Sequence, residues 1–262
     1  TVSDVTAGNN NVNGAVGGTW SGNAQFVAYS LKMLDNNNNV PVQFDAGDNS
    51  ATRSSLVSAN PEAGMSIVEL DKPNTNADTY NHGLSSAPTF IILKKLGATD
   101  DWYVYSSELG NSVRLSLNTT AAKVTGTGVW NSTNPTSTLF SLQNQLGGMH
   151  IAYCFHSVSG FSKFGSYTGD TSTYPTISAG FQPNFVMIKR TDSGDNWLIF
   201  DTKRDTSNPT NIALIPNSAA AESIGNLGNG ITIGTDGFVL NSTDTGINAN
   251  NGEYIYWAMK IN

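Results

Sequence analysis

The sequence contains few charged residues, and this already narrows the classes of protein to which it can belong. Only 13% of its 262 residues are Asp, Glu, Lys or Arg, about half of the roughly 25% typical of soluble domains. Gly, Ser, Thr and Asn replace the missing charges, and Asn alone accounts for 31 residues. Hydrophobic residues still make up 38% of the chain. This is enough apolar material for a core, so the composition excludes a chain that is disordered throughout.

Basic residues and long hydrophobic runs are also lacking. The 13 Lys and Arg residues are outnumbered by 20 Asp and Glu, and the pI is near 4.8. A nucleic-acid binder needs clustered cations that displace counterions from phosphates, and the densest positive stretches here are pairs such as Lys94-Lys95. No apolar run approaches the roughly 18 residues of a membrane-spanning helix. We therefore expect neither nucleic acid nor a membrane as a partner.

Cysteine occurs once, so the chain forms no internal disulfide and no cysteine-based zinc site. Cys154 lies in the apolar run 151–155, which favours a buried small side chain over a catalytic thiol. The nearest bases, His150 and His156, lie in or beside that run, and nothing completes a nucleophilic arrangement. The three histidines share no metal-ligand spacing. We expect no metal and no cofactor.

Motifs of common catalytic sites are absent as well. The chain has no Gly-x-Ser-x-Gly, no phosphate-binding loop ending in Gly-Lys-Ser/Thr and no His-Glu-x-x-His. The acids lie mostly in loop-like stretches such as Asp100-Asp101. Carboxylates that the fold brings together for glycoside hydrolysis stay an alternative, as does a calcium loop built from Asn and Asp. The prediction is that the protein is not an enzyme.

Short β-branched and aromatic runs dominate what the sequence does contain. Examples are residues 90–93, 102–105, 185–188, 197–200 and 254–257. The Gly, Asn, Asp, Ser and Thr clusters between them are typical of turns. Only residues 119–122 and 218–222 are rich enough in Ala to suggest a helical turn. The pattern predicts an all-β fold of tandem β-sandwich units, of jelly-roll or concanavalin type.

An internal repeat is the strongest pattern in the chain. Residues 88–95 (PTFIILKK) align without a gap with residues 183–190 (PNFVMIKR), and Trp102 aligns with Trp197 at the same separation. The separation grows toward the last strands, as insertions in loops would produce. The repeat predicts a first unit over residues 65–158 and a second over residues 159–262.

Residues 1–64 match the repeat only through residues 25–31 (QFVAYSL), which resemble the last strand of the first unit. We interpret 1–64 as the end of a preceding unit, or as N-terminal strands and a linker, with an exposed loop at 35–39. The chain begins at Thr1 without an initiator Met or a leader-like segment. It is expected to be a processed product or a fragment of a longer protein.

Positions shared by both units are interpreted as structural. Trp102 and Trp197 could stack on sugars, but residues held in common by two copies are explained more simply as core. Lys94 and Lys189 also correspond, and a Lys at the end of a strand is expected to extend into solvent or to protect a sheet edge.

Aromatic residues that the units do not share are the better candidates for binding. Trp130 lies in the Gly/Ser/Thr/Asn loop 125–133 and has no counterpart in the second unit. Trp20 lies among small residues at 17–22. An exposed ring beside Asn or Asp side chains suits contact with a glycan or a protein. We therefore assign Trp20 and Trp130 as candidate ligand-binding residues, with capping of the sandwich end or an oligomer contact as the alternative.

The chained motifs of the second unit resemble a repeat domain of tailed-phage virion proteins. They are FSKFGSYTG at 161–169, GFQPNFVMIKR at 180–190, Asn196-Trp197, Pro216-Asn217-Ser218 and Asp236-Gly237-Phe238. The resemblance covers roughly residues 65–262, and such domains occur especially in tail-fibre and surface proteins of marine and cyanobacterial phages. The first unit departs from the pattern, because residues 65–69 (MSIVE) lack the Gly-Ser-Tyr-Thr-Gly stretch. The family has no defined function and no catalytic residues to carry over.

This resemblance implies a phage structural protein on the virion surface. We expect a tail-fibre or surface-fibre module for host adsorption, acting through non-covalent glycan or receptor contacts that are summed over several copies. The expected partners are other copies of the chain in a symmetric homo-oligomer, with a trimer favoured, other virion proteins and a host-surface glycan. The alternatives are a capsid decoration protein and, third, a polysaccharide-cleaving enzyme.

Overall fold

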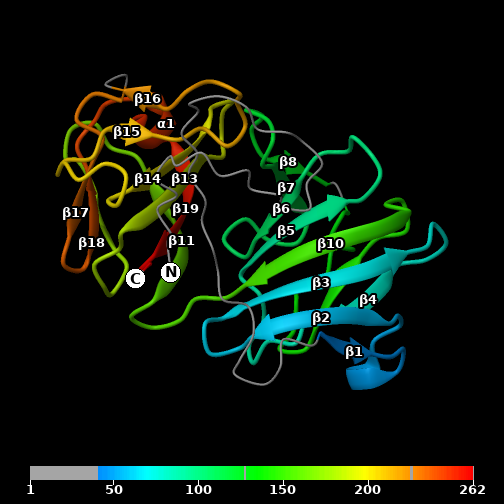
Figure 1. The fold of residues 1–262 in the computed structure, drawn as a ribbon. Helices are drawn as coiled ribbons and strands as arrows, with labels where there is room; N and C mark the ends of the chain where they lie inside the picture. Colours follow the sequence, from blue (N-terminus) through cyan, green and yellow to red (C-terminus); the bar gives the residue numbers. More distant parts are fainter. Residues whose placement is uncertain (1–40, 127, 225–226, 262) are drawn as a thin grey trace, which may run out of the picture.

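A computed structural model describes residues 41–126, 128–224 and 227–261. These residues form an almost all-β fold, which confirms the predicted class (Figure 1). The first half contains β1 (Val42–Phe44), β2 (Ser55–Asn60), β3 (Met65–Lys72), β4 (Asp78–Asn81), β5 (Phe90–Lys95), β6 (Tyr103–Ser106), β7 (Val113–Ser116), β8 (Val124–Thr125), β9 (Leu139–Leu142) and β10 (Gly148–Phe155). The second half contains β11 (Ser162–Thr168), β12 (Thr176–Ser178), β13 (Phe185–Arg190), β14 (Trp197–Asp201), β15 (Ile212–Ala213), β16 (Ser223–Ile224), β17 (Ile231–Gly234), β18 (Gly237–Leu240) and β19 (Glu253–Met259).

Helical structure is limited to two short elements in the described residues. They are the 3-10 helix η1 (Asp48–Ser50) and the single-turn helix α1 (Thr245–Asn248). The side chain of Asp244 accepts a hydrogen bond from the Gly246 amide at 2.8 Å and so caps α1. The Ala-rich segments 119–122 and 218–222 do not form the helical turns that their composition suggested. No helix among the described residues has the length and apolarity needed to cross a membrane.

The main sheets of the two halves share one plan. The first has the strand order β1-β2-β3-β10-β5-β6-β7-β8, and the second has the order β11-β19-β13-β14. β10 lies between β3 and β5 just as β19 lies between β11 and β13, and every pairing is antiparallel. Phe155 on β10 lies opposite Phe90, and Met259 on β19 lies opposite Phe185. Strand order and register are therefore common to both halves, and the pairing agrees with the alignment of residues 88–95 with 183–190. For the last strands the sequence match of 151–153 with 254–256 is one residue out, because the register places Ile151 at the position of Ile255.

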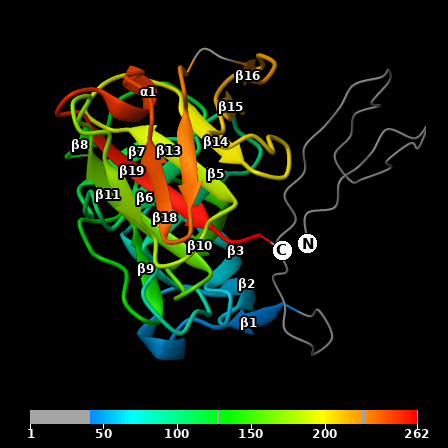
Figure 2. The ribbon, with the colours of Figure 1, turned by 90° about the vertical axis from the view of Figure 1, so that its left-hand side faces the viewer.

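Each main sheet is covered on its outer face and packs on the other main sheet with its inner face. The pair β4-β9 covers the first sheet, and β12-β18-β17 covers the second. Figure 2 looks onto the second half and shows β17 and β18 in front of β13 and β19, with the first half behind. The result is two β-sandwiches joined through a central apolar core to which both halves contribute.

Burial on both faces explains the uninterrupted apolar runs of β5 and β13. On β5, Ile91 belongs to the outer core of the first half, whereas Phe90 and Ile92 belong to the central core. On β13, Val186 belongs to the outer core and Phe185 to the central core. A strand buried on both sides has no polar face, so it reads as a continuous hydrophobic run instead of an alternation.

Backbone pairing places residues 42–60 in the first half. β2 pairs with β3 through residues 56–60, and β1 pairs with β2. The expected division at residue 64 therefore runs through a hairpin and does not separate two parts of the structure. The division at 158 lies in the loop between β10 and β11, where an isolated bridge joins Val158 and Ser162. The predicted loop at 35–39 lies outside the described residues.

Candidate functional site

Trp130, a predicted ligand-binding residue, is buried and not exposed. Only 1% of its surface is accessible. Its indole N–H donates to the Val113 carbonyl at 3.1 Å, and its ring meets that of Tyr105 edge-on at 5.5 Å. The expectation of an exposed ring is therefore wrong for Trp130, because the loop folds inward and the ring caps the outer core of the first half. The other predicted residue, Trp20, lies outside the described residues.

The two tryptophans at corresponding positions are held in the same way. The Trp102 amide donates to the Asn118 side chain at 2.9 Å, and the Trp197 amide donates to the Asn217 side chain at 2.8 Å. Trp197 is buried, and its indole N–H donates to the Ser116 carbonyl of the first half at 2.9 Å. Trp102 is half-buried against the central core. Both are structural, as the repeat predicts.

The lysines at corresponding strand ends differ in burial: Lys94 is half-buried, whereas Lys189 does not extend into solvent, which corrects the expectation for Lys189. The Lys189 ammonium is fully buried and donates to the Asp195 and Thr120 carbonyls at 2.8 and 3.2 Å. The Lys94 ammonium donates to the Ala98 carbonyl at 3.1 Å. Each lysine thus closes the loop after its own strand. Burial lowers the pKa of Lys189 to about 8.

The first half also buries an ion pair. The Lys72 ammonium is 2.9 Å from the Asp78 carboxylate, and Arg53 reaches the same carboxylate at 3.0 Å. Burial alone would raise the pKa of Asp78, but the hydrogen bonds and charges of Lys72 and Arg53 outweigh it, so that pKa is lowered. Asp78 is therefore a fixed anion that closes the loop after β3 and has no free proton to donate.

Cys154 and His82 are buried, and no described residue supplies either with a catalytic partner. Cys154 is fully buried, as predicted, and burial raises the pKa of its thiol. His82 accepts a hydrogen bond from the Leu84 amide at Nδ1, so its Nε2–H donates to the Thr136 carbonyl. Both bonds fit the neutral ring, and burial lowers the pKa of His82 to about 4. Within the described ranges, no group of three or more His, Cys, Asp or Glu residues could hold a metal ion.

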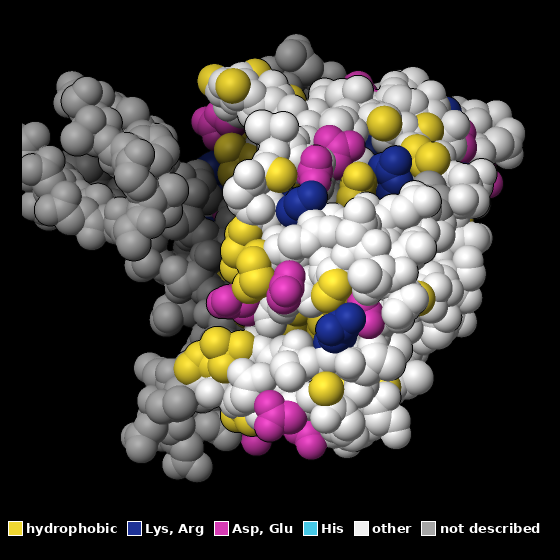
Figure 3. Space-filling view, turned by 90° about the vertical axis from the view of Figure 1, so that its right-hand side faces the viewer, with side chains coloured by type: hydrophobic (Ala, Val, Ile, Leu, Met, Phe, Trp, Pro, Cys, Tyr) yellow, Lys and Arg dark blue, Asp and Glu magenta, His cyan; other side chains and the backbone are white. Residues whose placement is uncertain are grey.

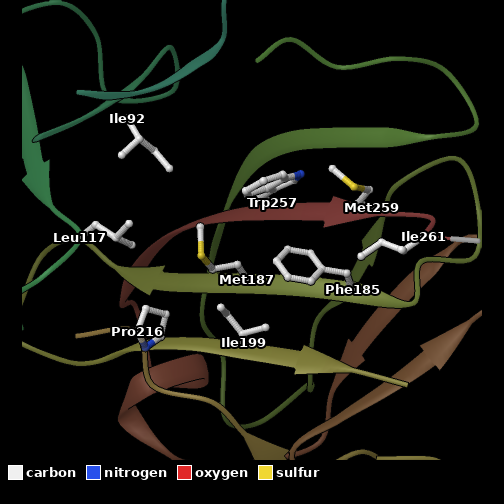
Figure 4. Close-up of a pocket in the computed structure, with 9 residues that line it drawn as sticks. All are labelled: Ile92, Leu117, Phe185, Met187, Ile199, Pro216, Trp257, Met259 and Ile261. Carbon is white, nitrogen blue, oxygen red and sulfur yellow. The ribbon is translucent and has the colours of Figure 1, made fainter. Parts of the chain in front are cut away.

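An apolar cavity of about 180 Å³ lies between the halves. In Figure 4, Ile92 and Leu117 of the first half lie across from Met187, Phe185 and Trp257 of the second half. All nine residues that line the cavity are apolar. Such a cavity accepts an apolar group but provides no polar atom to orient a ligand, so it is a feature of the central core.

Two polar hollows lie along β11 and share Glu108, Ser166 and Tyr167. The larger, about 670 Å³, also includes Lys123, Thr191 and Glu253, and we call it the junction hollow because both halves line it. The smaller, about 490 Å³, lies between β11 and β12, and we call it the strand-side hollow. Both hollows are open to solvent on the surface where the two halves meet.

The polar groups of the junction hollow are held in place. The Lys123 ammonium forms an ion pair with Glu253, and the Ser166 hydroxyl donates to the Glu108 carboxylate at 2.6 Å. The Lys123 amide also donates to the Thr191 carbonyl at 2.8 Å, which ties the first half to the second. The hollow therefore presents an ammonium group, two carboxylates and several hydroxyls in a fixed arrangement.

Aromatic stacking supports the floor of the junction hollow. The rings of Tyr167 and Tyr254 stack at 4.8 Å with an angle of 7° between their planes. The Tyr167 hydroxyl donates to the Ile247 carbonyl at 2.8 Å, and the Tyr254 hydroxyl donates to the Thr245 carbonyl at 2.6 Å. Burial raises the pKa of Tyr254 to about 12 and that of Tyr167 well above its usual value. Both phenols are therefore neutral hydrogen-bonding groups at neutral pH.

Charge is dispersed over the outer face of the first half. Figure 3 shows Lys and Arg side chains that lie apart from one another, with acidic side chains among them. A continuous basic patch for a phosphate backbone is not seen on this face.

Comparison with known proteins identifies a family and gives no activity. The family model described as "Domain of unknown function (DUF7483)" matches residues 36–261. None of the curated proteins matches the chain, and no solved structure matches it. Because the match covers nearly the whole chain, the protein belongs to the DUF7483 family of unknown function.

Proposed function

We propose that the chain is a surface module of a phage virion, part of a tail fibre or surface fibre, that contributes to host adsorption by binding a glycan. The binding site is the junction hollow. Its action is non-covalent and gains strength from several copies on one particle, because linked weak contacts produce high avidity.

The polar lining of the junction hollow is the observation that supports this proposal. Sugar hydroxyl groups both donate and accept hydrogen bonds, and the hollow offers both kinds of partner through Lys123, Glu253 and Thr191. Its two carboxylates already have partners, Glu108 with Ser166 and Glu253 with Lys123. This arrangement suits recognition better than hydrolysis, which needs one acid to protonate the leaving group and another to act as nucleophile or base.

A glycan array probed with the full chain, followed by titration of the best ligand, tests the proposal. Lys123→Met should weaken binding by about ten- to a hundredfold, the equivalent of one charged hydrogen bond. Lys95→Met is the matched control, because the Lys95–Asp100 pair is about as exposed as the Lys123–Glu253 pair but lies outside the hollow. Absence of any bound glycan, or equal loss in both variants, would contradict the proposal.

Immunogold labelling of intact particles separates the fibre proposal from the capsid alternative. Gold at the tail or its fibres supports the adsorption role. Gold over the head would replace it with a decoration role, and no label on any particle would contradict both.

A further inference from the structure

The two halves differ at one edge of their main sheets. In the first half, β3 pairs with β10 along one edge and with β2 along the other, which we call its outer side, and β1 follows β2 (Figure 1). In the second half, β11 is the counterpart of β3, and no strand among the described residues pairs with its outer side. The strand-side hollow lies along this uncovered edge.

The first half shows what fills the corresponding space there. Val57 of β2 is buried, and it lies so close to Gly83 that a Cβ atom on Gly83 would meet the Val57 Cγ1 atom at 2.7 Å. Gly180 is the counterpart of Gly83 and has a similar positive φ, +83° against +70°. A Cβ atom on Gly180 would have no atom within 4 Å. Among the described residues, no side chain therefore takes the place beside Gly180 that Val57 takes beside Gly83.

Part of the β11 edge is available for backbone pairing. Near its beginning, the Phe164 amide donates to the Ser157 hydroxyl at 3.0 Å, which blocks the outer side there. The Gly169 amide, on the inner side, donates to the Gly252 carbonyl at 2.8 Å. Because successive residues of a strand point their backbone groups to alternate sides, Ser166 and Thr168 direct theirs outward. An unpaired edge of this kind is a template for another strand.

β1 has the properties of the missing partner. It is the end strand of the first sheet among the described strands, and its three residues match the length of the segment from Ser166 to Thr168. Val42 is the most exposed of the large hydrophobic side chains described, at 57%, and it lies opposite Val57 and hence on the same face of the sheet. Asp45 follows β1, and Lys163 lines the strand-side hollow, so the contact also brings together opposite charges.

We propose that β1 of one copy of this chain pairs with the outer edge of β11 of a second copy. Val42 then occupies the space beside Gly180 in the way that Val57 occupies the space beside Gly83. The two surfaces differ, so the contact is heterologous, and each copy can join a further copy in the same way. This inference does not rest on glycan binding.

Light scattering of the full chain during size exclusion, over a wide range of concentrations, tests the pairing. The wild-type chain should self-associate as its concentration rises. Val42→Asp should raise the dissociation constant of self-association at least about tenfold, because it places a charge in the apolar space beside Gly180 of the second copy. Leu96→Asp, at another exposed hydrophobic residue, is the control and should leave self-association unchanged.

A second variant tests the edge of β11 itself. Ser166→Pro removes an outward N–H from an edge strand, where proline is tolerated, and should also abolish self-association. Ser166→Ala keeps the N–H and should not. Amide exchange at Ser166 and Thr168 should slow as the wild-type concentration rises and stay fast in Val42→Asp. A wild-type chain that is monomeric throughout, or equal behaviour of Val42→Asp and Leu96→Asp, would overturn the proposal.

Discussion

The two halves of the molecule are built on one strand order and one register, but they differ in what they bury and what they leave open. The first half buries the Lys72–Asp78 pair and His82 and covers its sheet edge with β2. In the part of the chain that the structure describes, the second half buries Lys189 without a carboxylate partner and has no strand paired with the outer edge of β11. Strand pairing and the central core are thus the common framework, and edges and loops are where the halves diverged. The candidate sites lie in those divergent parts.

The largest difference in stability loss between the two halves is expected for substitution of the two corresponding tryptophans. Trp197→Ala should lower the free energy of unfolding by about 3–5 kcal/mol, as expected for a large buried aromatic side chain. It also leaves the Ser116 carbonyl without its indole partner. Trp102→Ala should cost clearly less, because the ring is only half-buried. Denaturant unfolding of both variants measures the difference, and equal losses would show that the positions are energetically equivalent.

The next largest difference in stability loss is expected between substitutions of the two buried lysines, Lys72 in the first half and Lys189 in the second. Lys72→Met leaves the Asp78 carboxylate with the Arg53 guanidinium and the Thr52 hydroxyl, and it should cost about 3 kcal/mol, the low end for a broken buried ion pair. Lys189→Met removes hydrogen bonds to two carbonyls, and the Thr120 carbonyl keeps its bond from the Asp195 amide. We expect a cost of about 1–2 kcal/mol. A larger loss for Lys189→Met in thermal and chemical unfolding would contradict this ranking.

The buried His82 of the first half and the buried Lys189 of the second should make the free energy of unfolding depend on pH in opposite pH ranges. The folded-state pKa of His82, about 4, is below its usual value near 6.5. The unfolded chain therefore binds the proton first, and stability falls as the pH drops from 6.5 toward 4. The folded-state pKa of Lys189 is about 8 against the usual 10.5, so its contribution to stability rises as the pH increases from 8 to 10.5.

Single variants show which residue causes the acidic part and which the alkaline part of the curve of stability against pH. Unfolding curves of the wild-type chain, His82→Gln and Lys189→Met across this range measure the effect, which is about 1.4 kcal/mol for each unit of pKa difference. His82→Gln should flatten only the acidic side, and Lys189→Met only the alkaline side. An acidic limb that persists in His82→Gln would assign it to other groups, of which His150 is one whose pKa burial also lowers.

Local sequence patterns predicted the fold class well because apolar runs and turn residues act over a few positions. The repeat extended that prediction to corresponding tryptophans and strands. The inward fold of the Trp130 loop escaped prediction, because its Gly, Ser, Thr and Asn composition is the same whether the ring is buried or exposed. The burial of Lys189 escaped it too, since the carbonyls that accept its hydrogen bonds carry no signal in the sequence.

The junction hollow could not be predicted, because it arises from tertiary packing. Lys123 and Glu253 are 130 positions apart and meet only when the loop after β7 docks on the second half. Neither residue belongs to a motif. Alignment of the halves does provide one usable signal, since a glycine retained at both Gly83 and Gly180 marks a position with positive φ in each unit.

Alanine at these two glycines gives the smallest and sharpest test of the comparison. Gly180→Ala should cost only about 1 kcal/mol, the strain of a positive φ for a residue with a Cβ atom, because the added methyl group meets open space. Gly83→Ala carries the same strain and also a contact at 2.7 Å with Val57, so it should cost more and loosen β2. Thermal unfolding measures both. If Gly180→Ala proved as costly as Gly83→Ala, the space beside Gly180 would already be filled in the isolated chain. A small cost combined with weakened self-association would show instead that the space is a seat for a second copy.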